Sequence, residues 1–146
     1  MEQNQAQIEP LFYDTISSIQ SFGPRNLAAT CHKLAKIRKL CRWNIRNDVW
    51  TILEFEIIRS SESFDPMSTA SVAWALATSN RSSYAVWDKL GDAALHNIHE
   101  FNSQDIANTV WAYATVGHSS PQLFDQIAEI TPHRINEFNS QNIANT

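Results

Sequence analysis

The chain has 146 residues, of which 43% are hydrophobic, so it is long enough for one domain with a real core, and disorder is not the default expectation. Three glycines and five prolines are too few for a turn-rich sheet protein, and apolar residues recur three and four positions apart, so we expect an all-α fold. The net charge of -4 excludes a surface that is basic as a whole, which leaves nucleic-acid binding dependent on local clusters of charge.

The two cysteines do not make a disulfide framework in a chain of this size, and no secretory leader is visible, so we expect a reducing compartment. The first ten residues, MEQNQAQIEP, hold two acids and no arginine and do not resemble an organellar transit peptide. No apolar run reaches the length of a membrane span, so we expect a soluble protein.

The first segment, residues 1–21, is predicted to be part of a repeat. Within it, PLFYDTISSIQSF (10–22) is similar to PQLFDQIAEI (121–130) later in the chain. This similarity predicts that the chain begins with the second helix of a preceding helical hairpin.

Four blocks of similar sequence follow, and each begins with a phenylalanine. Phe22, Phe64, Phe101 and Phe138 are separated by 42, 37 and 37 residues, and an alanine stands six positions after each of them. A period near 37 residues predicts an α-solenoid of helical hairpins. The predicted units are residues 22–63, a divergent repeat with a basic stretch, residues 64–100, residues 101–137, and residues 138–146, the start of a truncated repeat.

Capping residues place the first helix of each hairpin. Asp65, Asn102 and Asn139 stand where a short side-chain acceptor would satisfy free backbone amides, and Pro66 suits a first helical turn. We expect these helices to end at Asn80 in one repeat and at Gly117 in the next, because both residues tolerate the left-handed conformation.

The second helix of each hairpin is expected to start after Ser83 or Ser120 and to cover about residues 84–99 and 121–136. Pro132 predicts a kink or a break near Thr131. The five extra residues of the repeat at 22–63 are expected to lie in the basic stretch between its two helices. Because both ends of the chain expose an unfinished repeat, we expect a fragment of a longer array.

Helical periodicity divides the first helix of the third block into two faces. The predicted core face has Ile106, Ala107, Val110, Trp111 and Ala114. The opposite, polar face has Gln104, Asp105, Asn108, Thr109, Ala112 and Thr115. We favour core packing over base stacking for the tryptophans. Asn108 and Asn145 fit equally a buried bridge to backbone carbonyls and an exposed side chain that reads a base edge.

Residues 32–46 hold six basic residues and no acid, which favours an anion-facing surface over a merely solvated one. These residues are Lys33, Lys36, Arg38, Lys39, Arg42 and Arg46. His96 and His99 lie one helical turn apart without a third ligand in place, so we expect surface residues and no metal. Cys31 aligns with Ala73 and Val110 and is expected in the core. No catalytic motif or cofactor-binding loop is visible, so we expect no enzyme and no cofactor.

The run QDIANTVWAYA (104–114), together with IANT (143–146), resembles the first helix of octotricopeptide-type repeats and of repeats found beside RAP domains, a group related to FAST kinase-like proteins. The resemblance covers residues 64–146 well and residues 8–63 loosely. It implies a right-handed α-solenoid that binds single-stranded RNA in the mitochondrion or chloroplast and guides RNA processing, stability or translation.

The predicted function is therefore an RNA-binding helical-repeat module without a small-molecule substrate. The six basic residues named above would contact the phosphate backbone of the RNA. Base contacts would come from the polar face of the first helices, with the candidates Gln104, Asp105, Asn108, Thr109, Gln141, Asn142 and Asn145. The alternative is a protein-binding scaffold of the HEAT or tetratricopeptide kind that uses the same surface.

Overall fold

The computed structural model describes residues 18–42 and 44–137. All regular structure in this part of the chain is helical, as the composition predicts. The α-helices are α2 (Pro24–Cys41), α3 (Asn47–Ser60), α4 (Pro66–Thr78), α5 (Tyr84–Asn97), α6 (Ser103–Val116) and α7 (Pro121–Ile130). Short 3-10 helices accompany them: η1 (Ile19–Ser21), η2 (Ser61–Ser63), η3 (Ile98–Glu100) and η4 (Thr131–Glu137).

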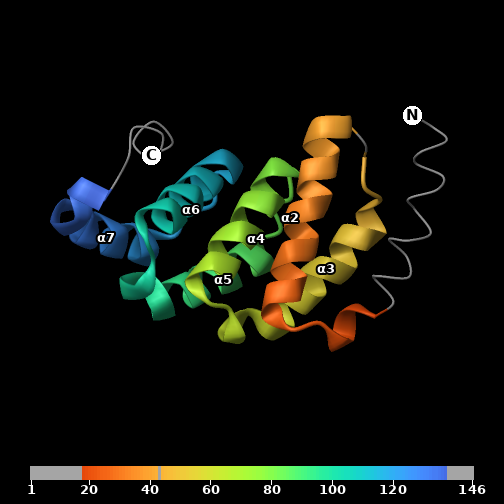
Figure 1. Ribbon diagram of the computed structural model, residues 1–146, viewed down its shortest axis with the longest axis horizontal. Helices are drawn as coiled ribbons and strands as arrows, with labels where there is room; N and C mark the ends of the chain where they lie inside the picture. The colour runs from red at the N-terminus through yellow and green to blue at the C-terminus, as the bar shows by residue number, and fades with distance from the viewer. Residues whose placement is uncertain (1–17, 43, 138–146) are drawn as a thin grey trace.

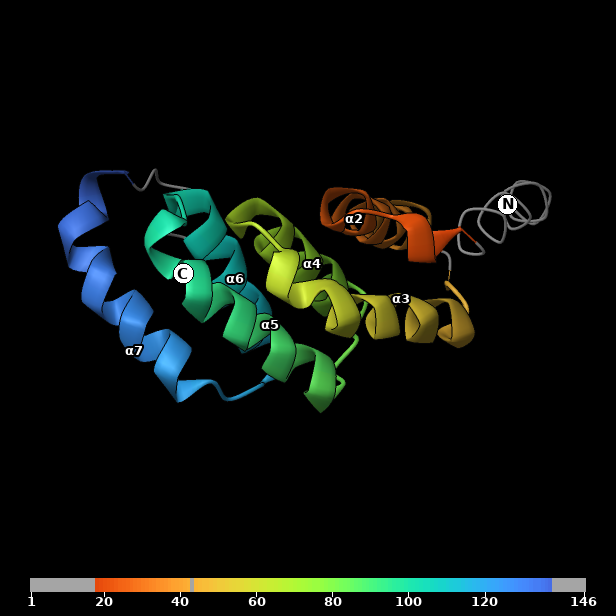
Figure 2. The same ribbon diagram turned by 90° about the horizontal axis from the view of Figure 1, so that it is seen from below.

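The α-helices form two layers. In one layer α2, α4 and α6 lie side by side, and α4 packs mainly against the other two (Figure 1). In the other layer α5 lies between α3 and α7, and the two layers are seen one above the other in Figure 2. Successive helices of one layer are thus separated in sequence by a helix of the other.

Local chemistry explains where α4 and α6 begin. The Asp65 carboxylate accepts a hydrogen bond from the Ser68 amide at 2.8 Å, and the Asn102 side chain accepts one from the Asp105 amide at 2.8 Å. The Asp105 carboxylate in turn accepts a hydrogen bond from the Asn102 backbone amide at 3.2 Å, and the two hydrogen bonds together form a capping box. The predicted caps at Asp65 and Asn102 are confirmed, whereas Asn139 lies outside the described residues.

The predicted ends of the same helices are also confirmed. Asn80 follows α4 with φ 59°, and Gly117 follows α6 with φ 71°. In both cases the chain leaves the helix in the left-handed conformation, where amides after the last turn bond back to its carbonyls, such as Gly117 N–H to Tyr113 O at 2.9 Å.

The starts of α5 and α7 correct one detail of the prediction. Ser83 and Ser120 do occupy the positions before these helices, but neither side chain makes the expected capping hydrogen bond. The Ser120 hydroxyl lies instead over Gly91 of α5, where a Cβ atom would come within 3.2 Å of it. Ser120 therefore serves the packing of α7 on α5 rather than the end of its own helix.

Pro132 acts as predicted. The α-helical part of α7 ends at Ile130, and the chain continues as η4, inside which Arg134 has the non-helical φ of -126°. Proline has no amide hydrogen and its ring clashes with the preceding turn, so the regular hydrogen bonding stops there.

The expected position of the basic stretch is wrong. Helix α2 runs for 18 residues, against 13 for α4 and 14 for α6, so most of the stretch belongs to the helix and only its end lies in the connection to α3. The sequence KLAKIRKL contains good helix formers and no glycine or proline, so nothing stops the helix before Arg42, which has φ 56°. The predicted helix in residues 10–17 and the repeat start at 138–146 lie outside the described residues.

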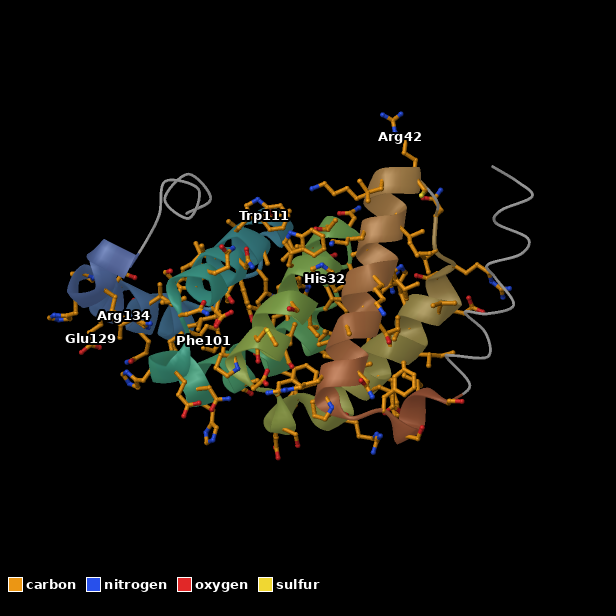
Figure 3. The ribbon with its side chains drawn as sticks, viewed as in Figure 1. His32, Arg42, Phe101, Trp111, Glu129 and Arg134 are labelled. Atoms are coloured by element: carbon orange, nitrogen blue, oxygen red, sulfur yellow. The ribbon has the colours of Figure 1, made fainter. Side chains whose placement is uncertain are left out.

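The core lies between the layers and is joined by hydrogen bonds between distant residues. The Trp87 ring is fully buried and packs edge-on against Tyr113, with ring centroids 4.9 Å apart. The Tyr113 hydroxyl donates to Trp87 O at 2.7 Å, and the Trp87 indole donates to Arg81 O at 2.8 Å. Figure 3 shows Phe101, another fully buried ring, at the start of α6.

The two cysteines differ in their surroundings, and we expect them to react differently with thiol reagents. Cys31 is fully buried, and burial raises the pKa of its thiol to about 12, whereas Cys41 is exposed at the end of α2. Only thiolates react readily. A colorimetric thiol titration of the native protein at pH 8 should show one fast-reacting thiol, lost in Cys41→Ser, and a second that appears only after denaturation. Two fast thiols would contradict the buried position of Cys31.

Candidate nucleic-acid interface on the α2, α4 and α6 layer

Each helix in the α2, α4 and α6 layer has a strip of residues that its neighbours leave open, and on α4 this strip is narrow. On α4 the residues around this strip are buried, because α2 and α6 cover its flanks and the second layer covers its back. We call the combined surface of these strips the open face. It consists of Arg25, Ala29, His32 and Lys36 on α2, Met67, Ser71, Trp74 and Thr78 on α4, and Gln104, Asn108, Trp111 and Thr115 on α6.

The open face follows directly from helix geometry. On each helix its residues are separated by four, three and four positions, which is the spacing that keeps side chains on one side of an α-helix. None of these residues is a carboxylate, although the chain as a whole is acidic.

The two layers differ in charge. Helices α2, α4 and α6 together have five basic residues and one acidic residue, whereas α3, α5 and α7 have two basic and seven acidic residues. The acidic net charge of the protein therefore comes mainly from the second layer. All five basic residues lie on α2, so an anion meets a locally positive potential at the α2 side of the open face.

The six predicted backbone-contact residues are not equivalent in the structure. Lys33, Lys36 and Lys39 are exposed on α2, and within the described residues none of them forms an ion pair. Arg42 extends from the end of α2, away from the other helices (Figure 3). Two of the six serve internal contacts as well.

These two are Arg38 and Arg46. The Arg38 guanidinium donates to Thr78 O, at the end of α4, at 2.8 Å. It is half-buried and ties α2 to α4. Arg46 directly precedes α3 and forms an ion pair at 2.7 Å with Asp48, which lies in the first turn of that helix. The three lysines of α2, together with Arg42, are therefore the cations best placed to meet a ligand.

A groove of about 310 Å³ lies between α2 and α4 beside these lysines. Arg25, which sequence reasoning missed, stands at one side of it and is paired with Asp65 at 3.2 Å. Burial raises the pKa of Asp65, but the Ser68 amide and hydroxyl and the Arg25 guanidinium outweigh this effect and lower the pKa overall. The other residues of the groove are Ala28, Ala29, His32, Lys33, Lys36, Met67, Ser68 and Ser71.

The predicted division of α6 into a core face and a polar face is partly wrong. Asp105, Thr109 and Ala112 are buried, whereas Ala114 is exposed and Val110 and Trp111 are only half-buried. The division assumed one covered side, but α6 is covered by α4 on its flank as well as by the second layer. Polar residues at its covered positions are therefore buried despite their chemistry.

The predicted base-contact residues of α6 therefore fall into two groups, one on the open face and one buried. Gln104 and Asn108 lie on the open face, where the Gln104 amide donates to Asn108 Oδ1 at 3.0 Å. Asp105 and Thr109 are turned away from it: the Asp105 carboxylate belongs to the capping box, and burial, the main cause, raises its pKa. Gln141, Asn142 and Asn145 lie outside the described residues.

His96 and His99 were the histidines considered as possible metal ligands. His96 and His99 are exposed, as predicted. Within residues 18–42 and 44–137, no group of three or more His, Cys, Asp or Glu side chains is arranged to hold a metal ion. None of the described helices is both long and apolar enough to cross a membrane.

Comparison with known proteins gives one family match. Residues 88–110 and 111–146, less than half of the chain, match a family model described as "Protein of unknown function (DUF1601)". The two matched segments adjoin each other within α6. No curated protein matches the sequence.

Proposed function

We propose that this chain is part of an α-solenoid with a repeat near 37 residues and that its open face binds single-stranded RNA. Three features support the repeat: the two layers of alternating helices, the caps at Asp65 and Asn102 that stand 37 residues apart, and the adjacent matches of one family model. A solenoid offers a long surface on which a strand of nucleic acid can lie.

The separation of charge between the layers is the observation that carries the RNA proposal. Affinity for a phosphate backbone depends on clustered cations that release counterions. Lys36 on the open face and Lys33 and Lys39 beside it on α2 provide such a cluster, and the open face has no competing carboxylate. A role in organellar RNA processing, stability or translation is the further part of this proposal and rests on the resemblance of residues 64–146 to octotricopeptide-type repeats.

Fluorescence anisotropy with a labelled pool of single-stranded RNA tests the proposal. We expect binding to weaken as salt rises, and the Lys33→Gln/Lys36→Gln/Lys39→Gln variant to lower the slope of log K against log salt by about 2, since each phosphate contact on a single strand contributes roughly 0.7. Lys36→Gln alone should weaken binding more than Lys89→Gln, a matched change on the acidic layer. An unchanged slope in the triple variant would contradict the assignment of these lysines.

A protein-binding scaffold is the second candidate, and an exposed apolar pair favours it. Ile52 and Phe55 lie nearly one turn apart on α3 with 42% and 62% of their surfaces exposed. Apolar side chains of this size on one helix face are common where proteins meet. If the protein binds no RNA at low salt while circular dichroism shows it to be helical, the RNA proposal fails and this second candidate is favoured.

A further inference from the structure

One aromatic ring per helix stands at the same place on the open face. His32 of α2, Trp74 of α4 and Trp111 of α6 each lie ten positions after the phenylalanine that opens their block. His32 and Trp74 are stacked, with centroids 4.8 Å apart and planes inclined by 25°. Figure 3 shows His32 between α2 and α4 and Trp111 on α6. We call these three residues the ring row.

The ring row differs from the tryptophans of the second layer. Trp50 and Trp87 are buried, and the Trp87 indole has an internal acceptor. Trp74 and Trp111 pack on the core but are only partly buried, so a part of each side chain remains in solvent. Core packing therefore accounts for the buried part of each side chain and not for the part that stays exposed.

The ring row lies beside the lysines. Lys39 Nζ stands 5.8 Å from the centroid of the Trp74 ring, and Lys33, Lys36 and His32 all border the groove between α2 and α4. The pKa of His32 is lowered by burial and by the nearby Lys36, so its ring is neutral near pH 7 and presents a flat, uncharged surface. Flat rings next to cations match the alternation of bases and phosphates along a single strand.

We infer that the ring row stacks bases of single-stranded RNA, one on the stacked pair of His32 and Trp74 and one on Trp111, while Lys33, Lys36 and Lys39 contact the phosphates beside them. This inference rests on the proposed function, and it names the part of the RNA that each residue meets. Because every base has a π-face, the ring row supplies affinity with little dependence on sequence. Gln104 and Asn108, next to Trp111 on the open face, are then the residues in reach of a base edge.

Two probes of equal charge test the inference: a 12-nucleotide oligoadenylate and an abasic ribose-phosphate strand of the same length. The native protein should bind oligoadenylate at least about fivefold more tightly, since stacking on one aromatic ring is worth roughly 1–3 kcal/mol, about five- to 150-fold. Trp74→Leu and Trp111→Leu should each lose about fivefold or more for oligoadenylate and leave binding of the abasic strand unchanged. Trp74→Phe, which keeps a ring, should retain most of the affinity.

The matched control is Tyr84→Leu, which removes an exposed ring from α5 in the other layer and should change neither affinity. Equal binding of both probes by the native protein, or full affinity in both tryptophan variants, would contradict base stacking on the ring row. Either result would leave the proposal of RNA binding by the lysines intact. If neither probe binds at low salt, both the proposed RNA binding and the inferred base stacking are wrong.

Discussion

Replacing Trp87 with alanine is expected to lower the free energy of unfolding by about 4 kcal/mol, because truncating a large buried aromatic ring typically costs 3–5 kcal/mol. The Trp87 side chain is fully buried, packs on Tyr113 and donates a hydrogen bond to Arg81 O. Its loss leaves a cavity between α5 and α6 and an acceptor without its donor. In a chain of this size, the expected decrease of the melting temperature is about 10 °C.

Thermal and urea unfolding followed by circular dichroism measure this effect. Tyr84→Ala is the matched control, because Tyr84 lies one turn earlier on the same helix with 73% of its surface exposed. It should change the free energy of unfolding by no more than about 0.5 kcal/mol. Equal effects of the two substitutions would show that Trp87 does not hold the layers together.

Replacing Arg81 with methionine is the second substitution with a large expected effect, a loss of about 2 kcal/mol. The Arg81 guanidinium donates to Glu54 at 2.7 and 3.2 Å and also contacts Asn47, so it joins the α4–α5 connection to α3. The Glu54 side chain is only 11% exposed, and removing its partner leaves a nearly buried carboxylate without its charge-assisted hydrogen bonds.

A double-mutant cycle isolates this pair. Glu54→Gln removes the charge that Arg81 neutralises, so the double variant should be more stable than the sum of the single losses predicts. Additive losses would show that the two side chains act independently.

Local features of the fold could be predicted from the sequence because their causes lie within a few residues. Asp65 and Asn102 cap the helices that follow them, Gly117 ends α6, and Pro132 ends the α-helical part of α7. Each of these effects depends on backbone geometry within one turn. The local prediction was wrong at α2, where a basic stretch of good helix formers was expected to form the connection, and at Ser83 and Ser120, whose side chains make no capping hydrogen bond.

The candidate site was harder to predict because it depends on which sides of a helix are covered. Helical periodicity separates apolar from polar residues, but it does not show that α6 has two covered sides and one open strip. Asp105 and Thr109 therefore appeared accessible, and Trp111 appeared buried. The contact between Arg81 and Glu54 joins residues 27 positions apart, and no local pattern indicates such a pair.

The hydrogen bonds that connect Tyr113 to Trp87, Trp87 to Arg81, and Arg81 to Glu54 have a mechanical consequence. They run from α6 through α5 and the α4–α5 connection to α3, and so join residues that are far apart in the sequence. Hydrogen bonds are short and directional, whereas the dispersion attraction in the apolar contacts between α4 and α6 depends less on direction. Sliding of α6 and α5 relative to α3 should therefore be resisted along this chain of hydrogen bonds more than along the apolar contacts between α4 and α6.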